Sequence, residues 1–257
     1  KQYLYYDDSI LLKRLSLYPY VQLGVMVLFV LIVYFALIST KKAEQNKVWV
    51  GLSKETAHQL GTPISSLMAW MDLLESSGVD PSLLSDMNKD VNRLSVIAER
   101  FSKIGSKPEM ELIYVNEVLE NATEYMRRRV SDKVLITTHL PSDAEGAMVC
   151  LSLFEWVIEN LCKNAVDAMN GEGRIDVYMT SEKQQIYIDI KDTGKGIARK
   201  NFKTVFNPGY TTKKRGWGLG LTLAKRIIED YHAGRIYVKD SEVGKGTTFR
   251  IELKRVV

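Results

Sequence analysis

The chain has 257 residues, of which 46% are hydrophobic and 26% are charged. This length allows one large domain or two smaller ones, and the composition is that of a folded protein. The net charge of +4 is small, and the basic residues form no block interleaved with aromatics, so we expect no nucleic-acid partner. The two cysteines, Cys150 and Cys162, lie in apolar surroundings without metal-ligand spacing, which favours two reduced structural thiols.

An uncharged apolar run covers residues 21–38, and Leu17 extends it backwards. Its length is close to the minimum that spans a bilayer, so we expect a transmembrane helix over about residues 17–39. The two lysines that follow favour a cytoplasmic C-terminal side, although the basic residues 13–14 weaken this assignment. A signal peptide is disfavoured because no small-residue cleavage site follows. A buried core helix remains the alternative, and it would need apolar partners on every side.

Two amphipathic helices follow, over residues 43–76 and from Pro81 to Ile104. Their apolar positions step by three and four, and Asp80-Pro81 supplies an N-cap and a first-turn proline for the second helix. Such a hairpin buries too little surface alone, so we expect a dimeric four-helix bundle. The positions that form this seam are Leu60, Ile64, Leu67, Met71, Leu74, Leu84, Met87, Val91, Leu94, Ala98 and Phe101.

His58 lies in the first of these helices, two positions before Leu60. At about 100° per residue it points roughly 200° away from the seam, which predicts exposure to solvent. An exposed histidine is accessible to another domain and can serve as a nucleophile. Taken alone, it is more simply interpreted as an idle surface residue.

The remainder of the chain has a mixed pattern. Helices on one face of a mixed sheet, a two-layer α/β sandwich, are expected from the order of these segments. After a linker over residues 105–108, helices are predicted over residues 115–129, 151–169 and 219–231. Strands are predicted over residues 133–140, 174–180, 185–191, 235–240 and 247–253.

Asn160 and Asn164 are four residues apart in the helix 151–169 and therefore share one face. Buried amides need polar partners, and a hydrated Mg²⁺ with phosphates would supply them. For the pair taken alone, capping or surface asparagines remain an alternative.

Glycine-rich segments follow. Asp192-Thr193-Gly194-Lys195-Gly196 comes directly after a strand, where the carboxylate can accept a hydrogen bond and the glycines admit a flat ring. Gly216-Trp217-Gly218-Leu219-Gly220-Leu221 opens the helix 219–231, whose free N–H groups suit phosphate. A Rossmann loop is disfavoured here because the spacing differs and no strand closely precedes it.

The histidine segment, the Asn-bearing helix and the two glycine-rich loops, in this order, resemble a sensor histidine kinase of a two-component system. The resemblance runs from about residue 48 to the C-terminus. It implies an α+β chain with a transmembrane helix, a dimerisation and histidine-phosphotransfer hairpin, and a two-layer ATP-binding domain of the Bergerat or GHKL type. We expect these parts over residues 1–42, 43–107 and 108–257.

The resemblance also implies the nucleotide site. Asn164 is expected to ligate Mg²⁺, with Asn160 in support and Lys163 near phosphate; Asp192 is expected to bind the adenine amino group. Residues 202–214 correspond to the mobile lid of this fold. The remaining expected contacts to ATP come from Gly194, Gly196, Thr211, Thr212, Lys213, Gly216, Gly218, Gly220, Leu221 and Thr247.

The implied reaction is ATP-dependent autophosphorylation of His58, followed by transfer to an aspartate of a separate response regulator. The implied location is the inner (plasma) membrane, with the kinase region of a homodimer in the cytoplasm. The sequence departs from the family at Gln59, where an acidic residue is common, and at Gly61, which replaces a basic residue. Thr62 matches the position that places hydrolytic water in the family. A phosphatase-dominant protein and a non-catalytic ATP-binding scaffold therefore remain alternatives.

Overall fold

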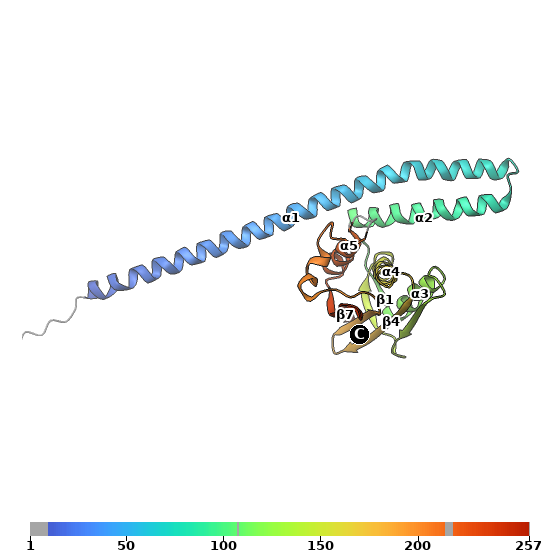
Figure 1. Ribbon diagram of the computed structural model, residues 1–257. Helices are drawn as coiled ribbons and strands as arrows, with labels where there is room; N and C mark the ends of the chain where they lie inside the picture. Colours follow the sequence, from blue (N-terminus) through green and yellow to red (C-terminus); the bar gives the residue numbers. More distant parts are fainter. Residues whose placement is uncertain (1–9, 107, 214–217, 257) are drawn as a thin grey trace, which may run out of the picture.

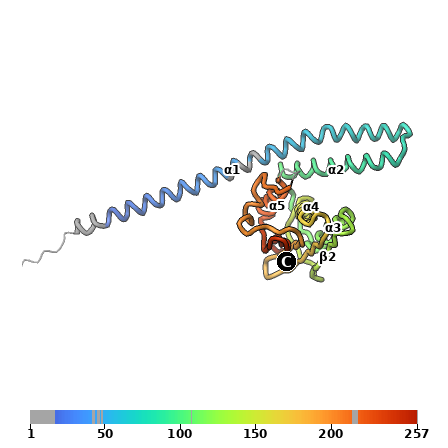
Figure 2. Tube along the Cα trace, in the orientation of Figure 1, coloured from blue at the N-terminus to red at the C-terminus, as the bar shows by residue number. Residues whose placement is uncertain are grey.

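The computed structural model describes residues 10–106, 108–213 and 218–256; for residues 10–16, 42–43, 45–46 and 48 it describes only the backbone. One long helix dominates the N-terminal half, and a compact α/β unit lies beside the hairpin that this helix begins (Figure 1). The tube view traces the same path along the long helix to the hairpin tip and back (Figure 2).

Helix α1 (Ile10–Ser76) contains 67 residues and joins two segments that the sequence pattern separates. The apolar run and the first hairpin helix are continuous, and Pro63 lies inside the helix. Its Leu17–Lys41 portion is long and apolar enough to cross a membrane, and none of it is buried against the rest of the protein. A helix of the protein core would be covered on every side, and this portion of α1 is not.

Helix α2 (Pro81–Gly105) returns along α1 and completes the hairpin. The Asp80 carboxylate accepts a hydrogen bond from the Ser82 backbone N–H at 2.9 Å, which is the predicted N-cap. In the connecting turn Gly78 has φ +79°, a conformation that glycine adopts without strain. The hairpin core is small, and it consists of the buried Ile64, Met71, Val91 and Ala98 with Leu60 packed against them.

The C-terminal unit is a sheet with helices on one face, as predicted. Its strand order is β1-β3-β7-β5-β4-β2, with β6 also paired to β7; β2 and β4 are parallel and the other pairs are antiparallel. The strands are β1 (Glu111–Tyr114), β2 (Val134–His139), β3 (Gly146–Val149), β4 (Gly173–Glu182), β5 (Gln185–Asp192), β6 (Arg235–Glu242) and β7 (Gly246–Val256). The helices are α3 (Val115–Arg127), α4 (Leu151–Ala168) and α5 (Gly220–Arg226).

Several segments differ from the sequence-based expectation. The short strands β1 and β3 were not predicted, because four residues carry too little alternation to be recognised. The expected helix 219–231 is α5 followed by a π-helical turn, η3 (Ile227–Tyr231). A 3-10 turn, η1 (Arg199–Asn201), directly precedes the expected lid, and a second one, η2 (Thr204–Phe206), lies inside it.

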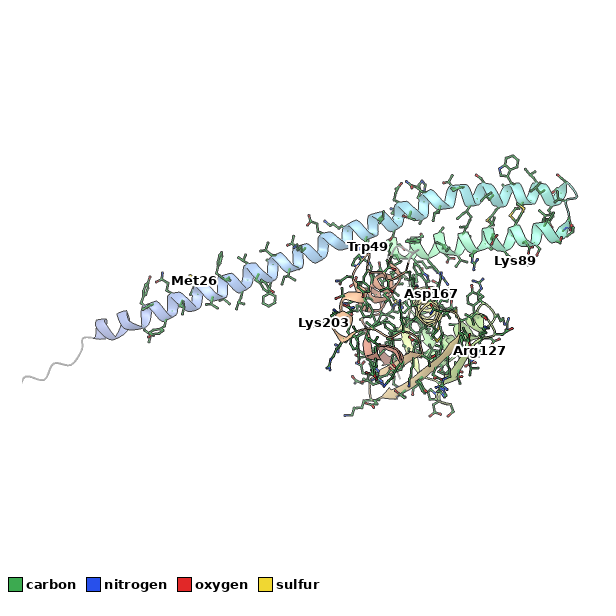
Figure 3. The ribbon with its side chains drawn as sticks, in the orientation of Figure 1. Met26, Trp49, Lys89, Arg127, Asp167 and Lys203 are labelled. Atoms are coloured by element: carbon green, nitrogen blue, oxygen red, sulfur yellow. The ribbon has the colours of Figure 1, made fainter. Side chains whose placement is uncertain are left out.

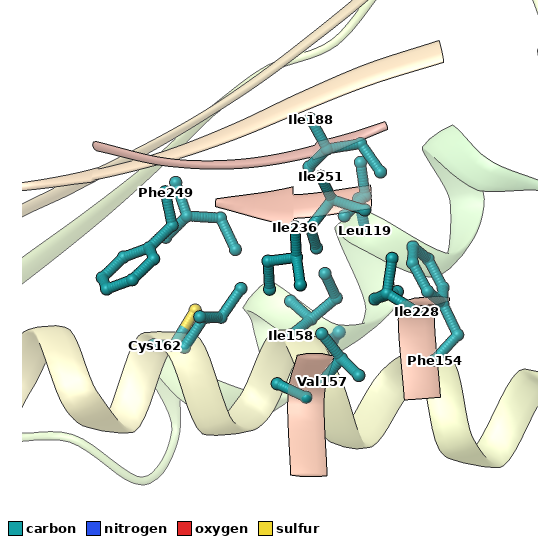
Figure 4. Close-up of a cluster of buried hydrophobic side chains, with 14 of the residues drawn as sticks. Leu119, Phe154, Val157, Ile158, Cys162, Ile188, Ile228, Ile236, Phe249 and Ile251 are labelled. Atoms are coloured by element: carbon teal, nitrogen blue, oxygen red, sulfur yellow. The ribbon is translucent and has the colours of Figure 1, made fainter. Parts of the chain in front are cut away.

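The core lies between α4 and the sheet. Phe154, Ile158 and Cys162 face Ile188 and Ile251 across the interior (Figure 4), and all five are buried. Burying a large apolar side chain contributes roughly 1.5–3 kcal/mol, so this layer holds α4 rigidly on the sheet. Both cysteines are free thiols, as expected, and burial raises the pKa of Cys162 to about 12, which keeps it unreactive.

The C-terminal end of α2 packs against this unit. The Tyr231 hydroxyl donates a hydrogen bond to the Ile104 carbonyl at 2.6 Å, and Phe101 meets the Trp156 ring edge to face at 5.9 Å between centroids. Trp49 of α1 packs on the same apolar core where the long helix passes the unit (Figure 3). The hairpin and the α/β unit are therefore in contact in this structure.

Candidate nucleotide site and phospho-accepting helix

The second half of α4 presents the polar side chains that the sequence singled out. Asn160 and Asn164 are half-buried rather than fully buried, and Lys163 is exposed. The Asn160 side-chain amide donates to the Gly220 carbonyl at 2.6 Å. This bond ties α4 to the first residue of α5, so two of the predicted site segments meet here. A Cβ at residue 220 would lie 2.7 Å from Asn160 Oδ1, which explains the glycine.

Asn164 faces the segment that precedes α5. Its Oδ1 accepts a hydrogen bond from Lys213 Nζ at 2.9 Å, and the same ammonium lies 2.5 Å from Asp167 Oδ2. Asp167 was not predicted as a site residue, and only its spacing of three from Asn164 could have indicated it (Figure 3 labels it). These two oxygens are negatively polarised, and the ammonium group of Lys213 is the cation that contacts them in this structure.

Asp192 ends β5 and is buried, with 3% of its surface exposed. Burial raises the pKa of its carboxyl above the ordinary range, while hydrogen bonds from the backbone N–H groups of Gly194 and Thr247 oppose this rise. The Gly194 bond measures 2.8 Å. A buried carboxylate at the end of a strand can accept a hydrogen bond from one polar group of a flat ligand.

A hydroxyl network supports this strand end. Ser241 accepts a hydrogen bond from the Ile197 N–H and donates to the Gly246 carbonyl, both at 2.8 Å. Because the Ser241 proton is used there, the Thr247 hydroxyl donates to Ser241 Oγ across 2.9 Å. Thr247 lies beside Asp192, its partner across β5 and β7, and Ser241 is a residue that no motif indicated.

The segment before α5 also connects to the Asp192 loop. Lys195 Nζ donates to the Thr212 hydroxyl at 2.8 Å, and the Lys213 N–H donates to the Thr211 hydroxyl at 3.1 Å. Thr211, Thr212 and Lys213 are exposed. Gly218 has φ +64° and lies against Gly209, where a Cβ would be 2.6 Å from backbone carbon.

The structure thus places four predicted segments around one region: the α4 amides, the Asp192 loop, the lid threonines with Lys213, and the start of α5. Leu221 is half-buried in α5, and Gly194 and Gly196 lie in the loop after β5. The predicted contact at Gly216 lies outside the described residues, as does Lys214 at the end of the expected lid.

His58 lies on α1 and is exposed, as its angular offset from the seam predicts. Gln59 and Thr62 are also exposed; the Thr62 hydroxyl is 3.4 Å from the His58 carbonyl, and Gln59 Nε2 donates to Glu55 Oε1 at 2.7 Å. Within the described residues, no hydrogen bond or ion pair joins His58 to the nucleotide-site cluster.

The fold is a two-layer α/β domain joined to a helical hairpin, with polar groups of four segments gathered in one region of that domain. Residues 149–257 match the family model described as "Histidine kinase-, DNA gyrase B-, and HSP90-like ATPase". Those residues are an ATPase domain of that family, and the chain is a homologue of the sensor histidine kinases.

Curated relatives extend the likeness across the hairpin. The chain is 26% identical to sporulation kinase A of Bacillus subtilis over 83% of its length and 36% of the relative's. It is 29% identical to sporulation kinase E of the same organism, over 83% of this chain and 29% of that relative. The sensor histidine kinase ZraS of Salmonella typhimurium is 26% identical, over 84% of this chain and 48% of that relative. The chain therefore spans about a third to a half of the length of these relatives.

Solved structures share the fold at lower identity. The catalytic domain of histidine kinase ThkA aligns with a TM-score of 0.52 at 22% identity, covering 57% of this chain and 96% of that one. The structure of ThkA in complex with the response regulator protein TrrA aligns with a TM-score of 0.55 at 19% identity, covering 84% of this chain and 64% of that one.

Proposed function

We propose that this chain is a membrane-bound sensor histidine kinase that phosphorylates His58 with ATP and passes the phosphoryl group to an aspartate of a response regulator. The observation that supports this most strongly is an exposed histidine on a hairpin that contacts, in the same chain, an ATPase domain with a formed cluster of polar residues. A general ATPase of the same fold would leave His58 without a role.

The adenine is expected to bind against Asp192, whose buried carboxylate would accept a hydrogen bond from the exocyclic amine. The triphosphate would extend toward Asn160, Lys163 and Lys213, with N–H groups at the start of the 220–231 helical run directed at phosphate. The lid residues Thr211 and Thr212 would close over it.

A Mg²⁺ ion fits the chemistry at Asn164. Asn164 is half-buried, and among the described residues the only hydrogen-bond partner of its amide oxygen is the ammonium of Lys213. The carboxylate of Asp167, one turn later, is bound by the same ammonium. Mg²⁺ takes one or two protein oxygens together with phosphates and waters. When bound, the ion would neutralise charge on the β- and γ-phosphates, and Lys213 would be released toward phosphate.

In the proposed step, a ring nitrogen of His58 carrying a lone pair attacks the γ-phosphorus in line. A nitrogen–phosphorus bond forms, the bond to the bridging oxygen breaks, and that electron pair leaves with ADP. The proton on the other ring nitrogen passes to solvent, which reaches this exposed ring. Positioning and charge neutralisation supply most of the rate.

His58 and the nucleotide cluster must approach each other for this step. Either the ATP-binding domain leaves the contact that it makes with α2, or a second copy supplies it. A homodimer is also supported by the hairpin itself, because the seam residues Leu67, Met87 and Leu94 remain about 40% exposed. A second hairpin would cover them in a four-helix bundle.

The Leu17–Lys41 portion of α1 supports a membrane anchor in the inner (plasma) membrane, with the hairpin over residues 43–107 and the ATP-binding domain over residues 108–257 in the cytoplasm. Because α1 is continuous, movement of the anchor would be transmitted directly to the helix that carries His58.

A second candidate is a protein that acts mainly as a phosphatase of the response regulator. Gln59 favours it, because an amide cannot serve as a base, and the Thr62 hydroxyl lies one turn from His58. A non-catalytic scaffold that only binds ATP is the third.

The test is incorporation of label from γ-labelled ATP with Mg²⁺ into the full chain held in detergent micelles. We expect label in the wild type and in His139→Ala, an exposed-histidine control, and none in His58→Ala. ATP binding without label would favour the two alternatives. Loss of labelled phosphate from an added phosphorylated receiver domain would then distinguish the phosphatase from the scaffold.

A further inference from the structure

The chain carries an acidic residue beside His58 that the proposed function leaves unused. Glu55 lies one helical turn before His58, and its carboxylate accepts a hydrogen bond from Gln59 Nε2 at 2.7 Å. Both side chains are exposed on α1. The bond therefore spans His58 along the helix and involves the residue that follows it directly.

The carboxylate fixes which way the Gln59 amide points. A carboxylate only accepts hydrogen bonds, so the amide atom that faces Glu55 must be the NH₂ nitrogen. The carbonyl oxygen of the amide, Oε1, is then directed away from Glu55 and remains an acceptor. Without Glu55, the two ends of the amide are interchangeable, and Gln59 would present a donor or an acceptor.

These side chains share one sector of the helix. At about 100° per residue, Glu55 lies roughly 60° from His58 around the axis and Gln59 roughly 100° on the same side. Pro63 adds a reason for a side-chain restraint here. It has no N–H, so the Gln59 carbonyl lacks its usual helical donor, and the Glu55 bond holds this turn.

We propose that Glu55 is a positioning residue for His58 and acts through Gln59. The carboxylate orients the amide so that Gln59 Oε1 accepts the N–H of one His58 ring nitrogen, which leaves the lone pair of the other nitrogen free to attack. The negative charge of Glu55 also polarises the amide and favours the positive charge that develops on the ring. This inference rests on the proposed autokinase function.

The alternative is that Glu55 and Gln59 form only a helix-surface pair at spacing i,i+4. Such pairs contribute about 0.2–0.5 kcal/mol to a helix and have no effect on a reaction. The two interpretations differ in what happens when the charge is removed or moved, while the fold is kept.

The experiment compares single-turnover phosphorylation rates of the full chain in detergent micelles for wild type, Glu55→Gln, and the exchange variant Glu55→Gln/Gln59→Glu. Glu75→Gln, an exposed carboxylate on the same helix, is the matched control. The ATP concentration for half-maximal rate is measured for each variant, and circular dichroism checks the helix.

We expect Glu55→Gln to lower the maximal rate by about ten- to a hundredfold, the range that one hydrogen bond to a charged group supplies. The ATP concentration for half-maximal rate should not change, since Glu55 does not touch nucleotide. The exchange variant should recover most of the rate, because the charge then lies next to His58 and the pair is preserved. Glu75→Gln should match the wild type.

A wild-type rate in Glu55→Gln would overturn the proposal, as would an exchange variant no faster than Glu55→Gln or a loss confined to ATP affinity. These outcomes leave the proposed function intact, because the wild type is still labelled. If the wild type itself carries no label on histidine, the proposed function fails, and this inference fails with it.

Discussion

Arg100 and Glu159 form a bidentate ion pair that joins the hairpin to the ATP-binding domain. Arg100 Nη1 lies 2.9 Å from Glu159 Oε2, and Nη2 lies 2.6 Å from Oε1. Only 14% and 21% of the two side chains is exposed, and the guanidinium also lies over the Trp156 ring at 5.6 Å. Because Asn160 follows Glu159 directly, this contact and the candidate nucleotide site adjoin on α4.

Removing one partner should weaken the contact between domains. Glu159→Ala would remove the carboxylate to which the largely buried Arg100 donates two hydrogen bonds, at a cost of about 2–3 kcal/mol. We expect faster hydrogen exchange at the C-terminal end of α2 and a change in Trp156 fluorescence. Asp86→Ala breaks the exposed Lys89–Asp86 pair and serves as the control, with an expected cost under about 1 kcal/mol. Unchanged exchange in Glu159→Ala would show that apolar contacts alone hold the domains.

Replacement of Asp192 should remove adenine preference. Asp192→Ala deletes a buried acceptor, so we expect ATP to bind about 30- to 150-fold more weakly, while GTP binding changes little. Equilibrium binding of both nucleotides to the full chain measures the ratio. A variant that keeps the wild-type preference for ATP would place the adenine elsewhere.

The same carboxyl predicts a pH dependence of binding. Burial raises the pKa of Asp192, so it gains its proton at a higher pH than an ordinary aspartate when the solution is acidified. ATP affinity should therefore decline by about fivefold as the pH falls from neutrality through the upper carboxyl range, because a charged acceptor becomes a neutral one. Asp192→Asn should flatten this part of the profile; a profile unchanged in the variant would contradict the assignment.

His232 predicts acid sensitivity of the fold. Its Nε2 accepts the Cys150 N–H at 3.0 Å, so Nδ1 carries the proton and donates to the Ile227 carbonyl at 2.7 Å. Burial lowers the pKa of this ring, so the unfolded chain binds a proton that the folded one does not. Stability is therefore complete above the ordinary histidine range and is lost as the pH falls through it.

The measurement is the urea concentration of half-unfolding, followed by tryptophan fluorescence at neutral and mildly acidic pH. His232→Phe should be less stable at neutral pH by about 1–3 kcal/mol and should show a smaller decrease on acidification. His139→Ala, which removes an exposed ring, should retain the wild-type decrease. An equal decrease in all three chains would mean that other groups cause it.

The segments that the sequence predicted best are those with strong periodicity. The predicted helix 151–169 and the strand 185–191 agree with α4 and β5 to within one residue at each end, because burial on one face sets a clear pattern. The strands β1 and β3 escaped prediction because four residues are too few to show a clear alternation. The π-helical turn η3 also escaped prediction. Its Tyr231 hydroxyl donates to the Ile104 carbonyl, and the Cys150 N–H donates to His232 directly after the turn; such distant contacts leave no local signal.

The site divides in the same way. Motifs indicated Asn160, Asn164 and Asp192, whose residue types and spacing suit the chemistry proposed for them. They did not indicate Ser241, Asp167 or Glu55, since what distinguishes these residues is a hydrogen bond to another side chain or carbonyl. Such supporting residues become visible only when the fold brings the segments together.

Asn164→Ala should abolish phosphorylation while the chain remains a folded dimer. The substitution removes the amide oxygen proposed for Mg²⁺ and touches no residue of the hairpin core. Label incorporation and the dimer mass in detergent by light scattering test both parts. Retained labelling with Mg²⁺ and ATP would remove the assignment of the metal to Asn164.

The most direct test of the central claim is to locate the phosphoryl group after reaction with γ-labelled ATP. Trypsin releases Glu55–Lys89 as one peptide, and His58 is its only histidine. Under neutral to alkaline handling, the account predicts label in this peptide that is stable to alkali, is lost in acid and is absent from His58→Ala. Acid-stable label, or label in any other peptide, would contradict the account.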